Sequence, residues 1–261
     1  MPQSVESRFG ASTLFYPEHI LRSDFADYKK YSSKSITAKA NYELWKTKDG
    51  DKVHVLGASP DEFMDDPEVL AEEQANAARA EAEDNAWGSK EALADMRIGC
   101  ALRVDFLVAL TFELNLWKWK TKEVVIYLIK PITEELRCRF ADHPLARKYK
   151  GKADALMSHA WDNEWGELIA AAAQGAPMNR FVWICAVANR QWPGNKADID
   201  FTTMVERTNA IVVANPVLDG KIFKSVLKRF TLSRIWCIGM NNSISHFLLQ
   251  VIDPPHPSSL C

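Results

Sequence analysis

The chain has 261 residues, of which 47% are hydrophobic and 25% are charged, and its net charge is -2. This composition is ordinary for a water-soluble globular protein, with enough residues for one large domain or two small ones. The near-neutral balance gives no electrostatic reason to expect binding to nucleic acid or to an anionic membrane surface.

Membrane, secretion and metal signals are also missing from the sequence. No apolar run approaches the roughly 20 residues needed to span a bilayer. The first residues, MPQSVESRFG, lack the basic and apolar regions of a secretory signal. The five cysteines are odd in number and contain no CxxC pair, which favours neither a zinc site nor a disulfide framework. We therefore expect a cytoplasmic protein without a bound metal.

Residues 1–95 are expected to form an irregular region followed by an acidic helix. Between residues 61 and 95 only Arg79 and Lys90 oppose a long series of acidic side chains. Asp66-Pro67 is a favourable helix start, because proline is well tolerated at the first helical position. The Ala- and Glu-rich sequence that follows has little apolar stripe, so we expect an exposed helix or linker.

Residues 96–150 are expected to connect this region to a second one through a strand and a helix. The alternation of apolar and polar residues from Arg103 to Trp117 predicts a half-buried strand, although Leu107 and Ala109 leave a buried helix open. Thr121 can cap a helix beginning at Lys122, which Pro131 should end or kink. Six basic residues then form a patch that could steer anions toward the next turn: Arg137, Arg139, Arg147, Lys148, Lys150 and Lys152.

Strands and helices alternate after Lys152, which predicts an α/β domain with a parallel sheet and flanking helices. Gly175 should end the first of these helices. The predicted strands are 153–157, 180–187, 210–214 and the segment SRIWCI, and the predicted helices are 162–174, a short one ending at 207, and 221–230. We place this domain at residues 151–240 and treat 241–261 as a divergent tail, because its composition changes abruptly.

Polar side chains follow the first two predicted strands. They are Ser158, His159, Trp161 and Asp162 after the first, and Asn189, Arg190, Gln191 and Trp192 after the second. Parallel strands share one carboxyl edge, so these residues are expected to converge on a nucleotide-like ligand. An arginine would hold phosphate, indoles would stack on a ring, and a helix N-terminus would add its dipole. Turn capping and packing are the alternative explanation for the same residues.

Other chemistries fit these residues poorly. Adjacent Ser158 and His159 rarely present a hydroxyl to an imidazole, and no GxSxG sequence is present. A Cys185–His159 dyad would need Cys185 at a strand end, whereas we expect it within the strand and buried. The absence of GxGxxG and Walker A sequences argues against dinucleotide binding of the Rossmann type.

Four segments in order carry a resemblance to a known family: MSHAWDNEWGELIAAA, FVWICAVANRQWPG, ERTNAIVVANPV and SRIWCI. Together they resemble a TIR-like domain, specifically the Ser-His-x-Trp variant of algae and other protists, which is related to fungal HET domains. The resemblance covers about residues 153–238. It implies a flavodoxin-like sheet, self-association and, in some members, hydrolysis of NAD at the nicotinamide–ribose bond. It also implies that Arg234 and Trp236 support the wall of the pocket.

The chain departs from the family at its catalytic position. Enzymes of the family carry a glutamate three positions after a Trp-Cys pair, and here Met240 follows Trp236-Cys237 at that spacing. Cys185 stands where HET-like members have aspartate. The nearest acids that could substitute are Asp162, Glu164 and Glu206. We therefore expect recognition of an NAD-like nucleotide with impaired NAD glycohydrolase activity; the alternative is a non-catalytic signalling or scaffold module that forms homo-oligomers.

Overall fold

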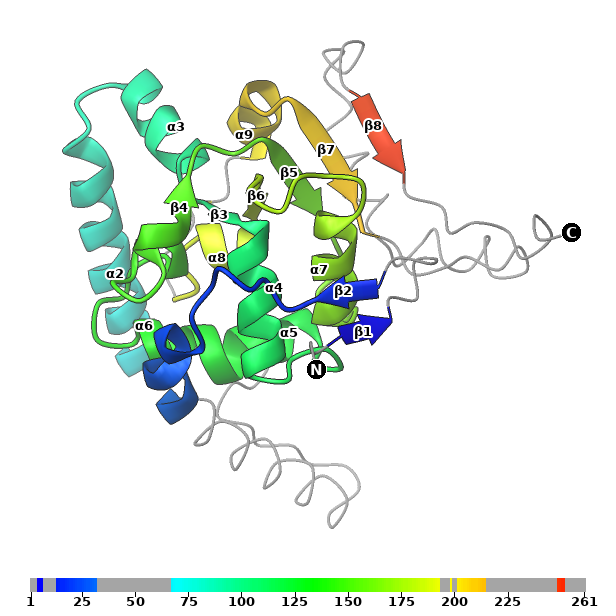
Figure 1. The fold of residues 1–261 in the computed structure, drawn as a ribbon. Helices are drawn as coiled ribbons and strands as arrows, with labels where there is room; N and C mark the ends of the chain where they lie inside the picture. Colours follow the sequence, from blue (N-terminus) through cyan, green and yellow to red (C-terminus); the bar gives the residue numbers. More distant parts are fainter. Residues whose placement is uncertain are drawn as a thin grey trace, which may run out of the picture.

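The computed structural model describes residues 4–6, 13–31, 67–192, 198, 201–214 and 248–251. A six-stranded sheet has the order β4-β3-β6-β5-β7-β8. Its strands are β3 (Ala101–Arg103), β4 (Lys150–Gly151), β5 (Ala155–Ser158), β6 (Phe181–Ile184), β7 (Ala210–Val213) and β8 (Leu248–Val251). Figure 1 shows β8 at one edge of this sheet and helix α2 (Pro67–Asn85) beyond the other edge. A separate hairpin pairs β1 (Ser4–Glu6) with β2 (Thr13–Phe15).

The sheet is mostly parallel. β6, β5, β7 and β8 run in one direction, whereas β3 pairs antiparallel with both β6 and β4. The register places Met157 of β5 beside Ile184 of β6 and Val212 of β7. The predicted strands at 153–157 and 210–214 are therefore confirmed as β5 and β7. The predicted strand at 180–187 is confirmed only in its first half, as β6, because residues from Cys185 onward form helix α8. Continuous apolar runs form them because helices cover parallel strands on both faces.

The predicted strand between Arg103 and Trp117 is wrong. This segment is helix α4 (Val104–Glu113), and its residues from Val104 to Thr111 are all buried. A helix surrounded by protein on every side needs apolar residues all round, so the period of 3.6 disappears from its sequence. The alternation of apolar and polar residues was therefore incidental, and the buried helix left open by Leu107 and Ala109 is the one that forms.

Helix α7 (Trp165–Ala173) packs against α4, and two features explain the close approach. The indole Nε1 of Trp165 donates to the Thr111 hydroxyl at 2.9 Å. Gly166 lies against the backbone of Trp117, where an added Cβ would come within 2.5 Å of the Trp117 carbonyl oxygen. Gly175, one position after the C-cap, has φ +63°, as predicted for a glycine that ends a helix.

The segment Thr121–Thr133 is continuous helix in three parts, namely α5 (Thr121–Val124), the π-helical η2 (Val125–Ile129) and α6 (Lys130–Thr133). Lys120 rather than Thr121 is the N-cap. Pro131 lies inside α6 and does not end the helix there; of the two predicted effects, an end or a kink, only the first is contradicted. The wider π turn, in which the Lys130 amide donates to the Val125 carbonyl, accommodates the proline ring and its missing donor.

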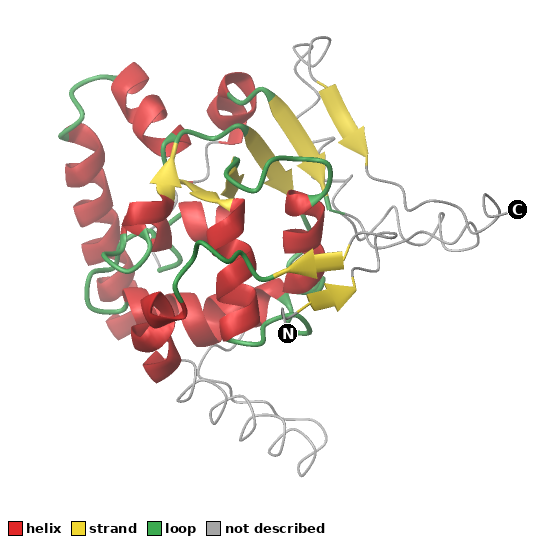
Figure 2. Cartoon of the chain, viewed as in Figure 1, coloured by secondary structure: helices red, strands yellow, loops and turns green. Residues whose placement is uncertain are grey.

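The remaining helices gather mainly on the β4–β3 side of the sheet (Figure 2). They include the predicted acidic helix α2, which begins at Pro67, α3 (Lys90–Ile98), α8 (Cys185–Ala188) and α9 (Phe201–Arg207). Short 3-10 turns are η1 (Arg22–Phe25), η3 (Phe140–Asp142) and η4 (Arg147–Tyr149). In the described part of the chain, no helix is both long and apolar enough to cross a membrane. The predicted helix 221–230 and the segment SRIWCI lie outside the described residues.

The N-terminal segment 13–31 packs on α4. Phe25 stacks on Phe106 with ring centroids 5.9 Å apart. The Asp105 carboxylate, fully buried in α4, accepts from Arg103 and lies 2.7 Å from His19 Nε2. Glu113, at the other end of α4, pairs with both Arg22 and Lys29 at 2.7 Å. Apolar side chains of residues 13–31 therefore belong to the same core as the sheet.

Candidate functional site

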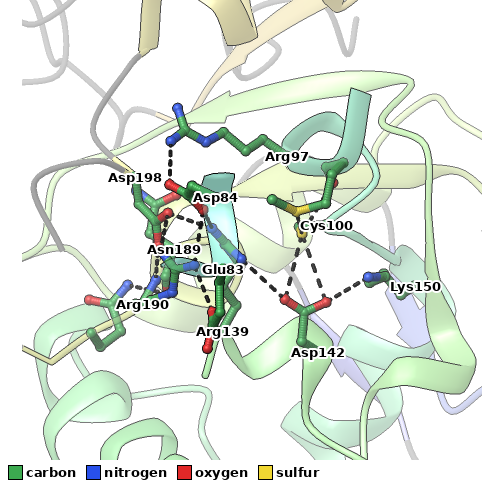
Figure 3. A network of polar contacts seen from close by, with 12 residues as sticks. Glu83, Asp84, Arg97, Cys100, Arg139, Asp142, Lys150, Asn189, Arg190 and Asp198 are labelled. Atoms are coloured by element: carbon green, nitrogen blue, oxygen red, sulfur yellow. Dashed lines mark hydrogen bonds and ion pairs between the residues drawn. The ribbon is translucent and has the colours of Figure 1, made fainter. Parts of the chain in front are cut away.

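A dense group of ionised side chains lies where the chain leaves β6. We call it the charge cluster, and its members are Glu83, Asp84, Arg97, Arg139, Asp142, Lys150, Arg190 and Asp198 (Figure 3). They come from the end of α2, from α3, from the segment around η3 and β4, and from the turn after α8. The cluster therefore joins the acidic helix to the carboxyl side of the sheet.

Asp198 anchors the inner part of the charge cluster. Its side chain is 1% exposed and accepts from Arg139 at 2.6 Å and from the Arg190 guanidinium at 3.0 Å. The backbone amide of Arg190 donates to the second Asp198 oxygen at 2.7 Å. Burial alone would lower the pKa of Arg139, but the groups around it, Asp198 foremost and Asp142 among them, together raise this pKa.

A second buried carboxylate, Asp84, lies on the other side of the same arginines. It accepts from Arg97 at 3.0 Å and from Arg190 at 3.1 Å. Its neighbour Glu83 accepts from Arg190 at 2.9 Å, but the Glu83 side chain is 49% exposed, against 8% for Asp84. Arg190 Nη1 therefore binds the buried Asp198, whereas its Nη2 donates both to the buried Asp84 and to the more exposed Glu83.

Asp142 and Lys150 form the outer wall of the cluster. Lys150 Nζ donates to Asp142 at 2.6 Å, and Arg139 lies 3.5 Å from the second Asp142 oxygen. Burial disfavours the charged lysine, but the contact with Asp142 raises the pKa of Lys150. The Cys100 Sγ is 4.0 Å from Asp142, and burial, followed by this carboxylate, raises the pKa of the thiol to about 12. Cys100 is thus a protonated core residue at neutral pH.

An open cleft of about 470 Å³ lies over the charge cluster. Five cluster members line it, together with Ala86, Trp87 and Met96: they are Glu83, Arg139, Asp142, Lys150 and Arg190. Trp87 is 49% exposed, so part of its indole is open to solvent beside the charged groups. The cleft thus combines positive groups, the carboxylates paired with them and one accessible aromatic side chain.

None of the four residues predicted after the first strand lines this cleft. Ser158 ends β5, and His159 is buried directly after it. Trp161 packs partly on the core, and its carbonyl accepts from the Lys122 amide at 3.0 Å. Asp162 is exposed and pairs with Lys122 at 2.6 Å, a hydrogen bond that lowers the pKa of Asp162.

The residues predicted after the second strand have structural partners. Gln191 Nε2 donates to the carbonyls of Cys185 and Asn189, which closes the turn after α8. Trp192 Nε1 donates to Thr133 at 3.1 Å, and Arg137 stacks 3.6 Å above the Trp192 ring. Of the four, Asn189, Arg190, Gln191 and Trp192, only Arg190 lines the cleft.

The two predicted groups contact opposite ends of the helix 121–133. Asp162 pairs with Lys122 near its start, and Trp192 bonds to Thr133 at its end. Eleven residues of helix span about 15 Å, so the described contacts place the two turns around separate points. Arg234, Trp236 and Met240 lie outside the described residues. Cys185 begins α8 at the end of β6 and is half-buried, not placed within the strand as predicted.

Glu83 and Asp84 were not predicted as site residues, because nothing in the sequence connects the acidic helix to a turn over 100 positions later. The basic patch was the available signal, since Arg139 and Lys150 belong to it and line the cleft. Among the described residues, no group of three or more His, Cys, Asp or Glu side chains could hold a metal ion. No family of proteins, curated protein or solved structure matches this chain.

Proposed function

We propose that the chain carries a TIR-like, flavodoxin-like α/β domain that recognises an NAD-like nucleotide in the cleft over the charge cluster. The order of the parallel strands supports the flavodoxin-like part of this proposal. Numbered along the chain, β6-β5-β7-β8 is second-first-third-fourth, which matches the start of the flavodoxin-like order 2-1-3-4-5. Ligands of such sheets bind outside the carboxyl ends of the strands, where Arg190 follows β6.

The observation that carries the proposal is the pairing of cations with an accessible indole in one cleft. Arg190, Arg139 and Lys150 line its wall, and Trp87 is exposed beside them. Guanidinium and ammonium groups hold phosphate oxygens through charge-assisted hydrogen bonds, whereas an indole stacks on a base or on nicotinamide. Both halves of a dinucleotide-like ligand therefore have a partner of suitable chemistry.

Recognition without efficient hydrolysis is the better-supported activity. Cleavage at the nicotinamide–ribose bond needs a carboxylate that is available to the ribose and to positive charge developing in the transition state. The carboxylates that line the cleft, Glu83 and Asp142, are already paired with Arg190 and Lys150. Asp162, a candidate substitute acid, pairs with Lys122 at a separate point.

Calorimetric titration with NAD and ADP tests the proposal, with adenosine as the uncharged comparison and chromatography of nicotinamide as the assay for turnover. We expect NAD and ADP to bind, adenosine to bind weakly, and no nicotinamide to be released. Lys150→Ala should weaken ADP binding about tenfold by removing one phosphate contact. Lys118→Ala is the matched control, because Lys118 pairs with Glu164 and does not line the cleft.

Two results would contradict the proposal. The first is the absence of binding by both NAD and ADP, which would favour the scaffold module and make sedimentation of the full chain the next measurement. The second is equal loss of affinity in Lys150→Ala and Lys118→Ala, because the cleft would then have no special role. Release of nicotinamide would support nucleotide binding but contradict the expectation that NAD is not hydrolysed.

A further inference from the structure

The charge cluster is neutral only when Glu83 is counted. In its buried part, three guanidinium groups face two carboxylates: Arg97, Arg139 and Arg190 against Asp84 and Asp198. Lys150 and Asp142 neutralise each other at 2.6 Å. The buried part therefore has one positive charge in excess, and Glu83 supplies the opposing negative charge through Arg190.

Glu83 also differs from the other carboxylates that contact Arg190. The side chains of Asp198 and Asp84 are 1% and 8% exposed, so removing either from its arginines would leave a buried charge without compensation. The Glu83 side chain is 49% exposed, so water can solvate its carboxylate when it leaves Arg190, provided that another anion then balances the buried positive charge. Exchange of one anion for another on Arg190 is therefore confined to the Glu83 position.

We infer that Glu83 occupies the place of the ligand's phosphate on Arg190, and that a phosphate-bearing ligand binds by displacing the Glu83 carboxylate into solvent. This inference rests on the proposed function, since it concerns the same cleft. It identifies the recognised group as a phosphate rather than an uncharged ring or sugar. Arg190 Nη2, which donates to Glu83 at 2.9 Å, would then donate to a phosphate oxygen. Because a ligand has to compete with the Glu83 carboxylate for Arg190, Glu83 also lowers the affinity of the protein for the ligand.

Removal of the competing carboxylate tests the inference in the full-length chain. ADP and inorganic pyrophosphate are titrated into the wild-type protein, Glu83→Ala and Glu83→Gln at low ionic strength, where such charges are least screened. We expect Glu83→Ala to bind both probes about 2- to 5-fold more tightly, and Glu83→Gln to fall between it and the wild type, because its amide oxygen still accepts from Arg190 without negative charge. Adenosine affinity should be the same in all three proteins. Glu81→Ala is the control, because Glu81 is an exposed acid on the same helix and does not line the cleft.

The outcomes separate this inference from the proposed function. Tighter binding of ADP and pyrophosphate in Glu83→Ala, but not in Glu81→Ala, supports both. If the wild-type protein binds the probes and both Glu83 variants bind them equally or more weakly, the inference is overturned and the proposed function stands. An equal gain in affinity in Glu81→Ala also overturns the inference, because the effect would then come from the overall negative charge of α2. No binding of either probe by any of the proteins overturns both proposals.

Discussion

Arg139 donates to Asp198 across 2.6 Å although 59 positions separate the two residues in the chain. Both side chains are almost completely buried, at 5% and 1% exposure. Removing two charges from water is costly, and their attraction repays this cost only when further hydrogen bonds complete the arrangement. Here Arg190 completes it, through its guanidinium and its backbone amide.

Asp198→Ala should therefore be severely destabilising. The substitution leaves Arg139 and Arg190 without their most buried counter-ion, and we expect a loss of about 3–5 kcal/mol in the free energy of unfolding. Urea unfolding followed by circular dichroism measures it, with Glu81→Ala as an exposed acidic control that should change stability by less than about 0.5 kcal/mol. Similar stabilities of the two variants would show that the buried pair is not needed for folding.

A second prediction concerns the hydrogen bond between α4 and α7. Thr111→Val keeps the shape of the side chain but leaves the Trp165 indole N–H buried without an acceptor, which should cost about 1–3 kcal/mol. Thr121→Val is the control: Thr121 is equally buried, but its hydroxyl makes only a 3.5 Å contact with the Asn163 carbonyl. Urea unfolding should rank Thr111→Val as clearly less stable than Thr121→Val. The reverse order would mean that packing, not this hydrogen bond, joins the helices.

Three of the six strands, β5, β6 and β7, could be predicted from sequence because they are short apolar runs bounded by polar turns and by Gly175. Strands β3 and β4 are too short to give such a pattern, and β8 lies in the segment that was treated as a divergent tail. The α4 segment could not be predicted either, because a helix buried on all sides loses the amphipathic pattern on which prediction depends. Asp105 illustrates the difficulty. It suggested a solvent-facing strand position, yet it is fully buried, and Arg103 and His19, which is 86 positions away, satisfy it.

Only part of the candidate site could be predicted from the sequence. Arg190 was identified because it follows a strand end, a position that local sequence defines. Its acidic partners Glu83 and Asp84 lie in a helix whose sequence favours solvent exposure, and only tertiary packing brings them to Arg190. Trp161 and Asp162 also follow a strand end, but contacts with the start of α5 hold their turn elsewhere.

Gly166→Ala should destabilise the protein, although alanine normally favours a helix over glycine by about 0.5–1 kcal/mol. The added Cβ would come within 2.5 Å of the Trp117 carbonyl oxygen and 3.0 Å of its Cα, and backbone atoms cannot move aside easily. We expect a cost of about 1–3 kcal/mol or more. Gly175→Ala has open space around it and should cost about 1 kcal/mol through its positive φ alone. Thermal unfolding that ranks the two in the opposite order would contradict the close approach of α7 to Trp117.

Asp24 helps to attach the N-terminal segment 13–31 to Lys148 and Tyr149, and acid should weaken this attachment. Hydrogen bonds from Lys148 at 2.8 Å and from the Tyr149 hydroxyl at 2.6 Å lower the pKa of Asp24 below its ordinary 3.8. A carboxyl with a lowered folded-state pKa stabilises the fold above its unfolded pKa, and this contribution is lost as pH falls through the folded value. The difference in unfolding free energy between wild type and Asp24→Asn should thus be constant above about pH 5 and shrink below about pH 4. Urea titrations across this range measure it, and Lys148→Met should reduce the same dependence; a difference that grows on acidification would contradict the assignment.

Trp87→Ala should weaken nucleotide binding without weakening the fold. The indole is 49% exposed beside the cleft, so its removal buries no new polar group and leaves no cavity in the core. Stacking of a base on an aromatic side chain contributes about 1–3 kcal/mol, which corresponds to at least a fivefold loss of ADP affinity, whereas pyrophosphate has no ring to lose. Leu136→Ala, which removes a similarly exposed apolar side chain that does not line the cleft, should leave both affinities unchanged. Equal losses for ADP and pyrophosphate in Trp87→Ala would mean that the indole shapes the phosphate site instead of stacking on a ring.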